Sequence, residues 1–249
     1  MRTGAIVQAR MASTRLPGKV LMPLPWGSGI SMLRLVVARL QRCTMLDAVI
    51  VATTTKVADN VIVKDITGAC KYFRGPEDDV LGRYHGAAKA FGLDVVVRIT
   101  SDCPFIDPSI IDAAIKKHAG SGFHYTSNVT FRTFPRGMDV EVFDVAALRD
   151  AHANAKEPYQ REHVTPYIQE HFRTQNITAY EMYSKNRYTR PDLRLTVDTL
   201  PDYTLACIVS DEMRTSTWNR FTYQDIVALF EKKPWLKDVN ADVVQKPVK

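Results

Sequence analysis

The residues between positions 9 and 19 are of the types that bind a chain of phosphate groups. This segment carries three cationic side chains, two hydroxyls and a glycine, namely Arg10, Arg15, Lys19, Ser13, Thr14 and Gly18. A guanidinium group donates paired hydrogen bonds to phosphate oxygens, and a lysine supplies a mobile positive charge. Backbone N–H groups in a turning loop add further donors. The segment therefore predicts a polyphosphate site, and the plainer alternative is a surface loop with scattered basic residues.

Two common phosphate-binding motifs do not fit this segment. A P-loop has serine or threonine after its Gly-Lys pair, but Val20 follows Lys19 here, and Ser13 stands where that motif has its first glycine. A dinucleotide fingerprint starting at Gly27 fails because Met32 replaces its third glycine. Kinase and dehydrogenase functions are therefore disfavoured.

A pair of aspartates, Asp102 and Asp198, forms the second pattern with chemical potential. Each follows a short apolar segment of similar sequence, residues 98–101 and 194–197. We therefore expect the two carboxylates at adjacent strand ends. Carboxylates together with phosphate oxygens are the hard ligands that Mg²⁺ prefers. The pair predicts a magnesium site, and the alternative is that each aspartate caps the helix that follows it.

The elements that must position these residues alternate between strands and helices. Short apolar runs predict strands at residues 4–9, 48–53 and 94–100, and apolar residues at helical spacing predict helices from residue 30 and at residues 59–67, 79–91 and 108–119. The cationic loop leaves the carboxyl end of the first strand, where ligands gather in open α/β sheets. We expect an α/β fold with a mostly parallel sheet covered on both faces.

The pattern changes after residue 120. Alternation predicts strands at residues 123–128, 138–143 and 177–183, with the second exposed on one side, and helices are expected at residues 145–155 and 160–172. The last third predicts a strand at residues 193–197, a helix at residues 201–211, and a final helix opened by Thr222 and Asp225 in a capping arrangement. Residues 121–190 would then form a lobe added to the sheet, or an arm that meets another subunit.

Length and composition favour one globular domain over residues 1–249. Hydrophobic residues make up 45% of the chain and charged residues 24%, which is close to the globular average. We expect no membrane span, no signal peptide and therefore a cytoplasmic protein. The spacing of the four cysteines indicates neither a zinc site nor a redox pair.

The formal net charge of +6 is compatible with an anionic partner. A non-catalytic nucleic-acid-binding protein is one alternative, but no basic block or aromatic-interleaved basic ribbon supports it. We therefore expect neither nucleic acid nor membrane as a partner.

The string IVQARMASTRLPGKVL, from Ile6 to Leu21, closely resembles the opening signature of the cytidylyltransferases that make CMP-activated sugar acids, in particular the branch named for spore coat polysaccharide biosynthesis protein F. The resemblance continues in further motifs and spans roughly residues 5 to 205. These motifs lie at residues 73–75, 79–84, 98–108, 137–143, 161–167 and 194–203. The resemblance implies a three-layer Rossmann-like nucleotidyltransferase fold with a small inserted arm that forms a homodimer.

The resemblance also implies roles for individual residues. The triphosphate of CTP would contact Arg10, Arg15 and Lys19, with Ser13 in the same loop, and Mg²⁺ would be held by Asp102 and Asp198. The cytosine would lie near Ala9, Thr53 and Thr54, with Arg83 as a weaker nucleotide contact. Ser101 departs from the branch, which often has glycine before the metal-binding aspartate.

The acceptor pocket is implied to lie in the middle segment, at Arg136, Asp139, Glu141 and His163, with Tyr125 and Asn128 as weaker candidates. Each has a structural alternative: Arg136 solvates a turn, Asp139 and Glu141 face water, and His163 packs on its helix. An arginine would suit an acidic acceptor.

The function predicted by these patterns and this resemblance is transfer of CMP from CTP to a sugar acid or a sugar phosphate, with release of pyrophosphate and a part in surface glycoconjugate or polysaccharide biosynthesis. In-line attack on the α-phosphorus would proceed with Mg²⁺, Arg15 and Lys19 neutralising the developing charge. The enzyme alternative is a sugar-1-phosphate nucleotidyltransferase that uses another nucleoside triphosphate.

Overall fold

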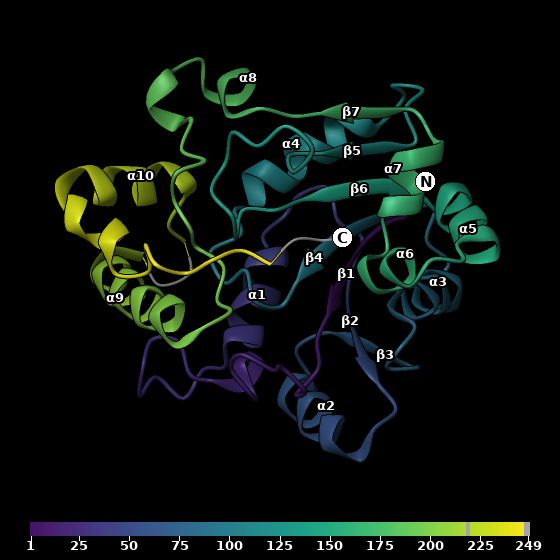
Figure 1. Ribbon diagram of the computed structural model, residues 1–249, viewed down its shortest axis with the longest axis horizontal. Coiled ribbons are helices and arrows are strands. Elements are labelled where there is room, and N and C mark those ends of the chain that lie inside the picture. Colours follow the sequence, from purple (N-terminus) through teal and green to yellow (C-terminus); the bar gives the residue numbers. More distant parts are fainter. Residues whose placement is uncertain (218–219, 247–249) are drawn as a thin grey trace.

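One twisted seven-stranded sheet forms the centre of the molecule in the computed structural model, which describes residues 1–217 and 220–246 (Figure 1). The strand order is β3-β2-β1-β4-β6-β5-β7. The strands are β1 (Thr3–Gln8), β2 (Ala48–Thr54), β3 (Lys71–Gly75), β4 (Val95–Thr100), β5 (Tyr125–Ser127), β6 (Glu141–Asp144) and β7 (Thr174–Asn176).

The sheet is mostly parallel, as the sequence predicts. Strands β3, β2, β1 and β4 pair in parallel, β6 runs antiparallel to both β4 and β5, and β7 pairs in parallel with β5. Segment 121–190 therefore contributes its three strands to the same sheet. Sequence order places β2 on one side of β1 and β4 on the other, and this divergence opens a crevice at the carboxyl ends of β1 and β4.

Helices cover both faces of the sheet, so the fold is the expected three-layer Rossmann-like arrangement (Figure 1). Successive residues of a strand point to opposite faces. Accordingly Ala5 and Val7 belong to one buried cluster, which includes residues of α1, α2, α4, α9 and α10, whereas Ile6 belongs to a second, which includes residues of α3, α5 and α7. These helices span Met32–Leu40 (α1), Asn60–Ile66 (α2), Val80–Ala90 (α3), Pro108–His118 (α4), Val145–Asn154 (α5), Pro166–His171 (α7), Leu200–Thr217 (α9) and Tyr223–Lys232 (α10).

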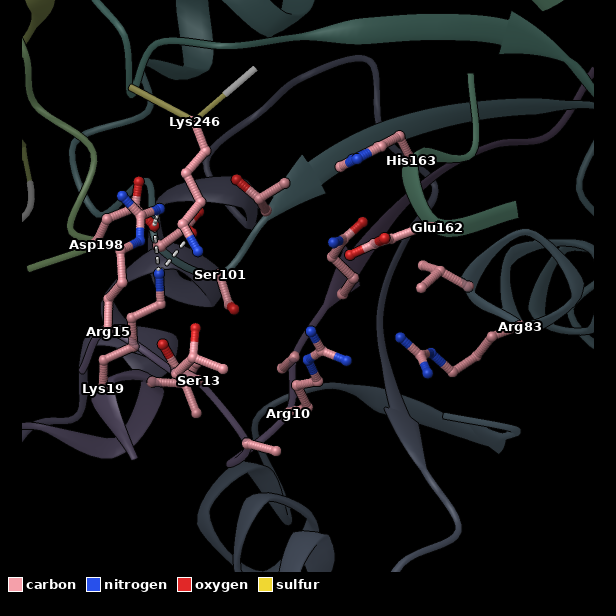
Figure 2. Close-up of a pocket in the computed structure, with 18 residues that line it drawn as sticks. Arg10, Ser13, Arg15, Lys19, Arg83, Ser101, Glu162, His163, Asp198 and Lys246 are labelled. Atoms are coloured by element: carbon pink, nitrogen blue, oxygen red, sulfur yellow. Dashed lines mark hydrogen bonds and ion pairs between the residues drawn. The ribbon is translucent and has the colours of Figure 1, made fainter. Parts of the chain in front are cut away.

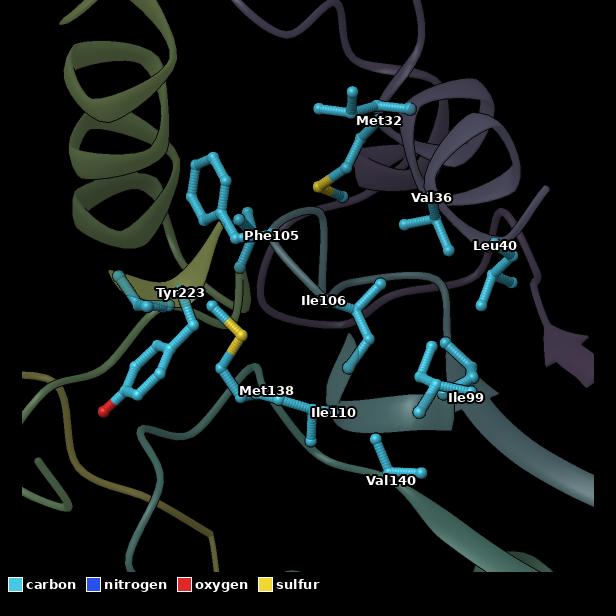
Figure 3. Close-up of a cluster of buried hydrophobic side chains, with 14 of the residues drawn as sticks. Met32, Val36, Leu40, Ile99, Phe105, Ile106, Ile110, Met138, Val140 and Tyr223 are labelled. Carbon is cyan, nitrogen blue, oxygen red and sulfur yellow. The ribbon is translucent and has the colours of Figure 1, made fainter. Parts of the chain in front are cut away.

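The larger cluster fixes the loop that follows β4. Phe105 and Ile106 are fully buried in this loop, and they belong to the same cluster as Met32 and Val36 of α1 (Figure 3). Burying side chains of this size contributes about 1.5–3 kcal/mol each. The packing of these two side chains therefore holds the loop that contains Asp102 in place.

Four sequence expectations about the elements are wrong. Residues 160–172 form two helices, α6 (Pro158–His163) and α7, because Val164 adopts a positive φ of 71° and Pro166 starts the next helix. Residues 177–183 contain the helix α8 (Ala179–Tyr183) in place of a strand, since Thr178 and Glu181 form a capping box at its start. The other two concern residues 193–197 and 138–143.

Residues 193–197 are extended but join the sheet through no ladder, and only an isolated bridge links Arg194 to Arg136. Strand β6 begins at Glu141, and its residues Glu141, Val142 and Phe143 are buried, so the strand has no water-facing side there. Its alternating sequence reflects a buried charge, which periodicity alone does not distinguish from an exposed one.

The sequence patterns did not predict the short edge strand β3. Its sequence, KYFRG, has no apolar run, and its first two residues are exposed. Helix α9 starts at Leu200, near the expected position, and extends beyond residue 211. The capping box of Thr222 and Asp225 at the start of α10 is confirmed.

Short 3-10 helices lie at Lys19–Leu21 (η1), Val57–Asp59 (η2), Asn186–Tyr188 (η3) and Pro234–Asp238 (η4). Within the described ranges, no helix is both long and apolar enough to cross a membrane.

Candidate active site

A cavity of about 320 Å³ opens at the carboxyl ends of β1 and β4 (Figure 2). Its lining combines the end of β1 and the loop after it, the end of β4 and the loop after it, two residues each of α3 and α6, and two residues from the C-terminal part of the chain. The lining residues are Gln8, Ala9, Arg10, Ala12, Ser13, Thr14, Arg15, Lys19, Val20, Val80, Arg83, Thr100, Ser101, Asp102, Glu162, His163, Asp198 and Lys246. Nine of the predicted site residues lie here, namely Ala9, Arg10, Ser13, Arg15, Lys19, Arg83, Asp102, His163 and Asp198.

The ammonium group of Lys19 joins the cationic loop to both aspartates. Its Nζ atom donates to Oδ2 of Asp102 at 2.8 Å and to Oδ1 of Asp198 at 2.9 Å, and also to the carbonyl oxygen of Val197 at 2.8 Å. Burial alone would lower the pKa of Lys19, but the charges of Asp102 and Asp198 raise it. Lys19 is therefore fully protonated near neutral pH.

A backbone hydrogen bond joins the two segments that carry Asp102 and Asp198. The N–H of Val197 donates to the carbonyl oxygen of Asp102 at 2.8 Å, which sets the extended segment 193–197 beside the loop that follows β4. The sequence expectation that the two carboxylates meet is thus correct. The contact between segment 193–197 and the loop after β4 brings them together, and the two aspartates do not follow adjacent strands of the sheet.

The capping alternative does not hold for Asp102, since the residue that caps α4 is Asp107, whose side chain accepts from the N–H of Ser109. At α9, the Oδ2 atom of Asp202 accepts from the N–H groups of Asp198 and Thr199. The carboxylate of Asp198 instead accepts from cations. Both aspartates therefore present their carboxylates to the cavity.

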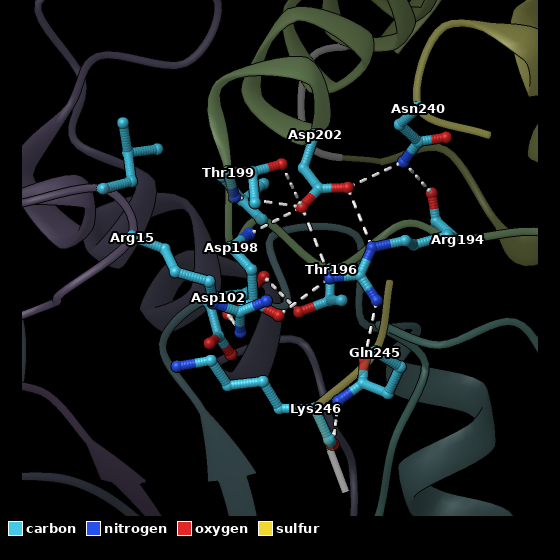
Figure 4. A network of polar contacts seen from close by, with 12 residues as sticks. Arg15, Asp102, Arg194, Thr196, Asp198, Thr199, Asp202, Asn240, Gln245 and Lys246 are labelled. Carbon is cyan, nitrogen blue, oxygen red and sulfur yellow. Dashed lines mark hydrogen bonds and ion pairs between the residues drawn. The ribbon is translucent and has the colours of Figure 1, made fainter. Parts of the chain in front are cut away.

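Asp198 is surrounded by positive charge. Besides Lys19, it pairs with Arg15 at 2.9 Å and with Arg194 at 2.8 Å (Figure 4). Arg194 also pairs with the buried Asp202 at 2.9 Å. Burial alone would lower the pKa of Arg194, but hydrogen bonding to Asp202 and the charges of Asp202 and Asp198 raise it.

The start of the cationic loop is tied to the end of β2. Asp59 is buried, and its carboxylate accepts from the N–H of Met11 at 2.8 Å and from the hydroxyl of Thr54. The N–H of Gly18 closes the loop onto the carbonyl oxygen of Met11 at 3.0 Å. Gly18 has a φ of 70°, in the region that favours glycine. These bonds fix the path along which Arg15 and Lys19 reach the aspartates.

Two guanidinium groups, those of Arg10 and Arg83, lie in another part of the cavity, away from Asp198 (Figure 2). Arg83 donates to the carbonyl oxygen of Pro76 at 2.7 Å, and its buried Nε has no hydrogen-bond partner in the part of the chain that the structure describes. Burial lowers the pKa of Arg83, and the charge of Arg10 lowers it further. Arg10 pairs with no carboxylate among the described residues. This part of the cavity therefore has two guanidinium groups against one lining carboxylate, that of Glu162.

His163 and Glu162 line the same part of the cavity from the end of α6 (Figure 2). The positive φ at Val164 ends this helix and turns the chain away. Burial lowers the pKa of His163 below 6.5 despite the opposing charge of Glu162. The imidazole is therefore mainly neutral at pH 7.

Five predicted site residues do not line the cavity. Thr53 and Thr54 are fully buried, and the Thr54 hydroxyl is bonded to Asp59. The other three were predicted for the acceptor. Glu141 forms a buried ion pair with Arg98 and accepts hydrogen bonds from Tyr125 and Thr165.

The remaining two acceptor candidates, Asp139 and Arg136, also lie outside the cavity. Asp139 pairs with Arg132 at 2.5 Å, and the carbonyl oxygen of Arg136 accepts from the N–H of Leu195 at 2.7 Å. Asn128 is buried and bonded to the backbone of Val140 at 2.9 Å. Arg136 and Asp139 lie in the loop that precedes β6, and Asn128 directly follows β5.

Sequence reasoning missed several lining residues, among them Gln8, Glu162 and Lys246. Gln8 and Glu162 lie inside motifs that were recognised, and their positions beside Ala9 and His163 were a usable signal. Lys246 lies in a polar C-terminal segment without any motif. No pattern in the chain connects it to the cavity.

The donor set around the Lys19 ammonium fits a hard cation. Two carboxylates and one carbonyl oxygen converge there, and oxygen is the ligand that Mg²⁺ prefers. Within residues 1–217 and 220–246, no group of three or more histidine, cysteine, aspartate or glutamate side chains forms a self-sufficient metal site. A divalent ion held by the two aspartates would therefore need oxygens from a ligand.

The fold is of the Rossmann-like nucleotidyltransferase class, with a charged cavity at the carboxyl ends of β1 and β4. The sequence matches the cytidylyltransferase family model over residues 4–230. The chain therefore belongs to the cytidylyltransferase family.

Two similar proteins cover most of the chain. An uncharacterised protein of Methanocaldococcus jannaschii is 36% identical over 247 residues, which are 99% of this chain and 97% of that protein. Spore coat polysaccharide biosynthesis protein SpsF of Bacillus subtilis is 37% identical over 207 residues, covering 80% and 82% of the two chains.

Solved structures of similar proteins agree with the fold. A cytidylyltransferase from Leptospira borgpetersenii has a TM-score of 0.86 at 30% identity and covers 99% of this chain and 100% of its own. A CMP:2-keto-3-deoxy-manno-octonic acid synthetase complexed with CTP has a TM-score of 0.62 at 16% identity, over 85% of this chain and 100% of that chain. At that identity, the second structure supports the fold alone.

Proposed function

We propose that this protein transfers CMP from CTP to a sugar acid or a related acceptor and releases pyrophosphate. The observation that carries the proposal is the convergence of Arg15 and Lys19 with Asp102 and Asp198 in one cavity. Family membership supports nucleotidyl transfer, and the name of the SpsF relative supports a role in polysaccharide biosynthesis.

The cationic loop would bind the triphosphate. Arg15 and Lys19 lie at the end of the cavity that contains Asp102 and Asp198, which we call the aspartate end. Arg10 lies in the same loop and has no carboxylate partner among the described residues. Arg15 would donate to phosphate oxygens through a planar fork, and Lys19 would act as a point charge. Ser13 and the backbone of the turn would add uncharged donors.

Asp102 and Asp198 would hold Mg²⁺ together with phosphate oxygens of CTP. When bound, the ion would supply positive charge that stabilises the phosphate oxygens during transfer. The carboxylate of Asp102 is ionised near neutral pH in its absence, because Lys19 lowers the pKa of Asp102 against the effect of burial, which alone would raise it.

The reaction needs alignment more than covalent participation by the protein. An acceptor oxygen would attack the α-phosphorus in line with the bond to the β-phosphate, which breaks as pyrophosphate leaves. Arg15 and Lys19 would meet the negative charge that accumulates on the phosphate oxygens. No enzyme-bound intermediate is required.

The acceptor would occupy the part of the cavity lined by Arg10, Arg83, Glu162 and His163. The guanidinium group of Arg83 suits a carboxylate or a phosphate on the acceptor, whereas that of Arg10 would remain with the triphosphate. The neutral imidazole of His163 suits a sugar hydroxyl, because it offers one donor and one acceptor nitrogen. This assignment replaces Arg136, Asp139 and Glu141, which lie outside the cavity.

Pyrophosphate release tests the proposal. The purified protein is supplied with Mg²⁺, a panel of sugar acids and sugar phosphates, and CTP, UTP, GTP, ATP or dTTP in turn. The proposal expects acceptor-dependent pyrophosphate release with CTP and little with the other nucleotides. Release with UTP or dTTP and a sugar 1-phosphate, but not with CTP, would support the alternative nucleotidyltransferase.

A further inference from the structure

The C-terminal segment returns to the cavity after the last described 3-10 helix. From η4 the chain runs back along segment 193–197, and its described part ends at Lys246 beside the cavity (Figure 1, Figure 4). Asn240 is buried at the start of this return, and its amide donates to Oδ1 of Asp202 at 2.8 Å and to the carbonyl oxygen of Arg194 at 3.1 Å. We call residues 240–246 the return segment.

The far end of the return segment is tied to the site through Arg194. The Oε1 atom of Gln245 accepts from Nη1 of Arg194 at 2.7 Å, while Nη2 of the same guanidinium donates to Asp198 at 2.8 Å (Figure 4). One arginine therefore bonds both the segment and a predicted metal-binding aspartate. This contact places the next residue, Lys246, at the cavity.

Lys246 extends its side chain into the aspartate end of the cavity. It lines the cavity with Arg15, Lys19, Asp102 and Asp198, and its ammonium group points toward this cluster (Figure 2, Figure 4). Within the part of the chain that the structure describes, Lys246 has no ion-pair or hydrogen-bond partner for its side chain. Lys246 is therefore a cation without an anionic partner among residues 1–217 and 220–246.

The charges around Lys246 show what it is suited to bind. Arg15 and Lys19 are already paired with the aspartates, so their positive charge is offset within the protein. The cavity as a whole is lined by five lysine and arginine side chains against three carboxylates. At the aspartate end, the excess charge resides on Lys246. An anionic ligand with several oxygens would complete this arrangement.

We propose that Lys246 binds the β- and γ-phosphates of the nucleoside triphosphate, as a further substrate-binding residue supplied by the return segment. This inference rests on the proposed function. It assigns a role outside the region matched by the family model, which ends at residue 230. The triphosphate is favoured over an acceptor anion because Lys246 lies with Arg15 and Lys19, whereas Arg10, Arg83 and His163 line the other part of the cavity (Figure 2).

Equilibrium binding of CTP, CMP and pyrophosphate by calorimetry tests this role. The protein is compared with Lys246→Ala, Lys246→Arg and, as a matched control, Lys237→Ala, an exposed lysine of η4 that does not line the cavity. We expect Lys246→Ala to weaken CTP and pyrophosphate binding about tenfold. CMP binding should be nearly unchanged, because CMP has neither the β- nor the γ-phosphate. Lys246→Arg should retain most of the affinity, and Lys237→Ala all of it.

The outcomes separate this inference from the proposed function. If the unsubstituted protein binds CTP and Lys246→Ala binds it equally well, the role of Lys246 is refuted while the proposed function stands. An equal loss for CMP and CTP, or a loss confined to acceptor KM, also refutes contact with the β- and γ-phosphates. If the unsubstituted protein neither binds CTP nor releases pyrophosphate from it, both proposals fail.

Gln245→Ala supplies a second test that leaves the lysine in place. Removing the bond to Arg194 frees Lys246 from its position, so the same selective loss should appear in a smaller amount. A melting temperature equal to that of the unsubstituted protein would exclude unfolding as the cause. A Gln245→Ala variant that loses CMP affinity as much as CTP affinity would contradict the anchoring role.

Discussion

The Nζ atom of Lys19 lies 2.8 Å from Oδ2 of Asp102, although 83 positions separate the two residues in the chain. Burial alone would raise the pKa of Asp102, and the positive charge of Lys19 reverses this effect and lowers it. The loop that begins after β1 and the loop that begins after β4 are therefore one electrostatic unit. A substitution in either loop should affect the other.

Asp102→Asn is expected to reduce kcat/KM at least about a hundredfold, since losing one preorganised charged group at a reacting centre costs on the order of 10²–10³ in rate. Loss of the charge pair with Lys19 should also lower the melting temperature, but the side chain keeps its size, so the protein should stay folded at the assay temperature. Pyrophosphate release gives the rate and calorimetry the melting temperature. Asp211→Asn, at an exposed position of α9, is the matched control and should keep full activity. Retention of full activity by Asp102→Asn would remove this residue from the site.

Lys19→Met is expected to lower the free energy of unfolding at pH 7, because Asp102 loses its paired cation, whereas Asp198 keeps Arg15 and Arg194. The loss should stay below the about 3–5 kcal/mol of a fully buried pair, since the Asp102 side chain is 23% exposed. Urea unfolding measures the change. A loss no greater than that of Lys237→Ala would show that the bridge contributes nothing.

The same variant has a predicted pH dependence. In the unsubstituted protein the folded-state pKa of Asp102 lies below 3.8, so its contribution to stability is present above that pH and is lost as the pH falls through the lowered value. Without Lys19, burial dominates and raises the folded-state pKa. The stability difference between the two proteins should therefore be largest near neutral pH and narrow below about pH 4. A difference that is constant from pH 7 to pH 3 contradicts this account.

Glu141→Gln is expected to act on stability. Arg98 and Glu141 are 14% and 6% exposed, and removing one partner of a buried ion pair typically costs about 3–5 kcal/mol. Glu162→Gln, at a carboxylate that lines the cavity, should instead change acceptor KM and leave the melting temperature unchanged. Thermal unfolding and steady-state kinetics on both variants distinguish the two roles. The reverse result would return Glu141 to the acceptor site.

Asp59→Ala is expected to cost about 1–3 kcal/mol, because the N–H of Met11 and the hydroxyl of Thr54 lose a buried acceptor. The cationic loop would lose its attachment to β2, so the KM for CTP should rise several-fold while acceptor KM changes less. Thr54→Val, which removes only one of the two donors, should show a smaller effect in both measurements. If Asp59→Ala destabilises the protein without changing KM for CTP, the loop is held by other contacts.

The strands that position the site could be predicted from sequence because they are buried on both faces. The segments that become β1, β2 and β4 are nearly continuous apolar runs, and a parallel strand in the middle of a sheet has this composition. The cationic loop and Asp102 follow two of these strands directly. Because β1 and β4 are parallel neighbours, their carboxyl ends lie at the same edge of the sheet, and the cationic loop and Asp102 therefore lie close together.

The remaining features depend on contacts that no local pattern encodes. Glu141 alternates with apolar residues as a solvent-facing residue would, yet Arg98 from β4 makes its burial possible. Segment 177–183 alternates like a strand, but the capping box of Thr178 and Glu181 starts a helix. Lys246 lies at the cavity next to Gln245, which accepts a hydrogen bond from Arg194. Each of these outcomes is decided by a residue distant in sequence or by a cap.

A crystal structure of the protein with CTP and Mn²⁺, in which anomalous scattering locates the ion, tests the central claim most directly. The account predicts an ion between the carboxylates of Asp102 and Asp198 and a triphosphate on residues 10–19, with the ammonium of Lys19 turned toward phosphate oxygens. A nucleotide bound away from this cavity, with Lys19 still joining both aspartates and no ion between them, would contradict it.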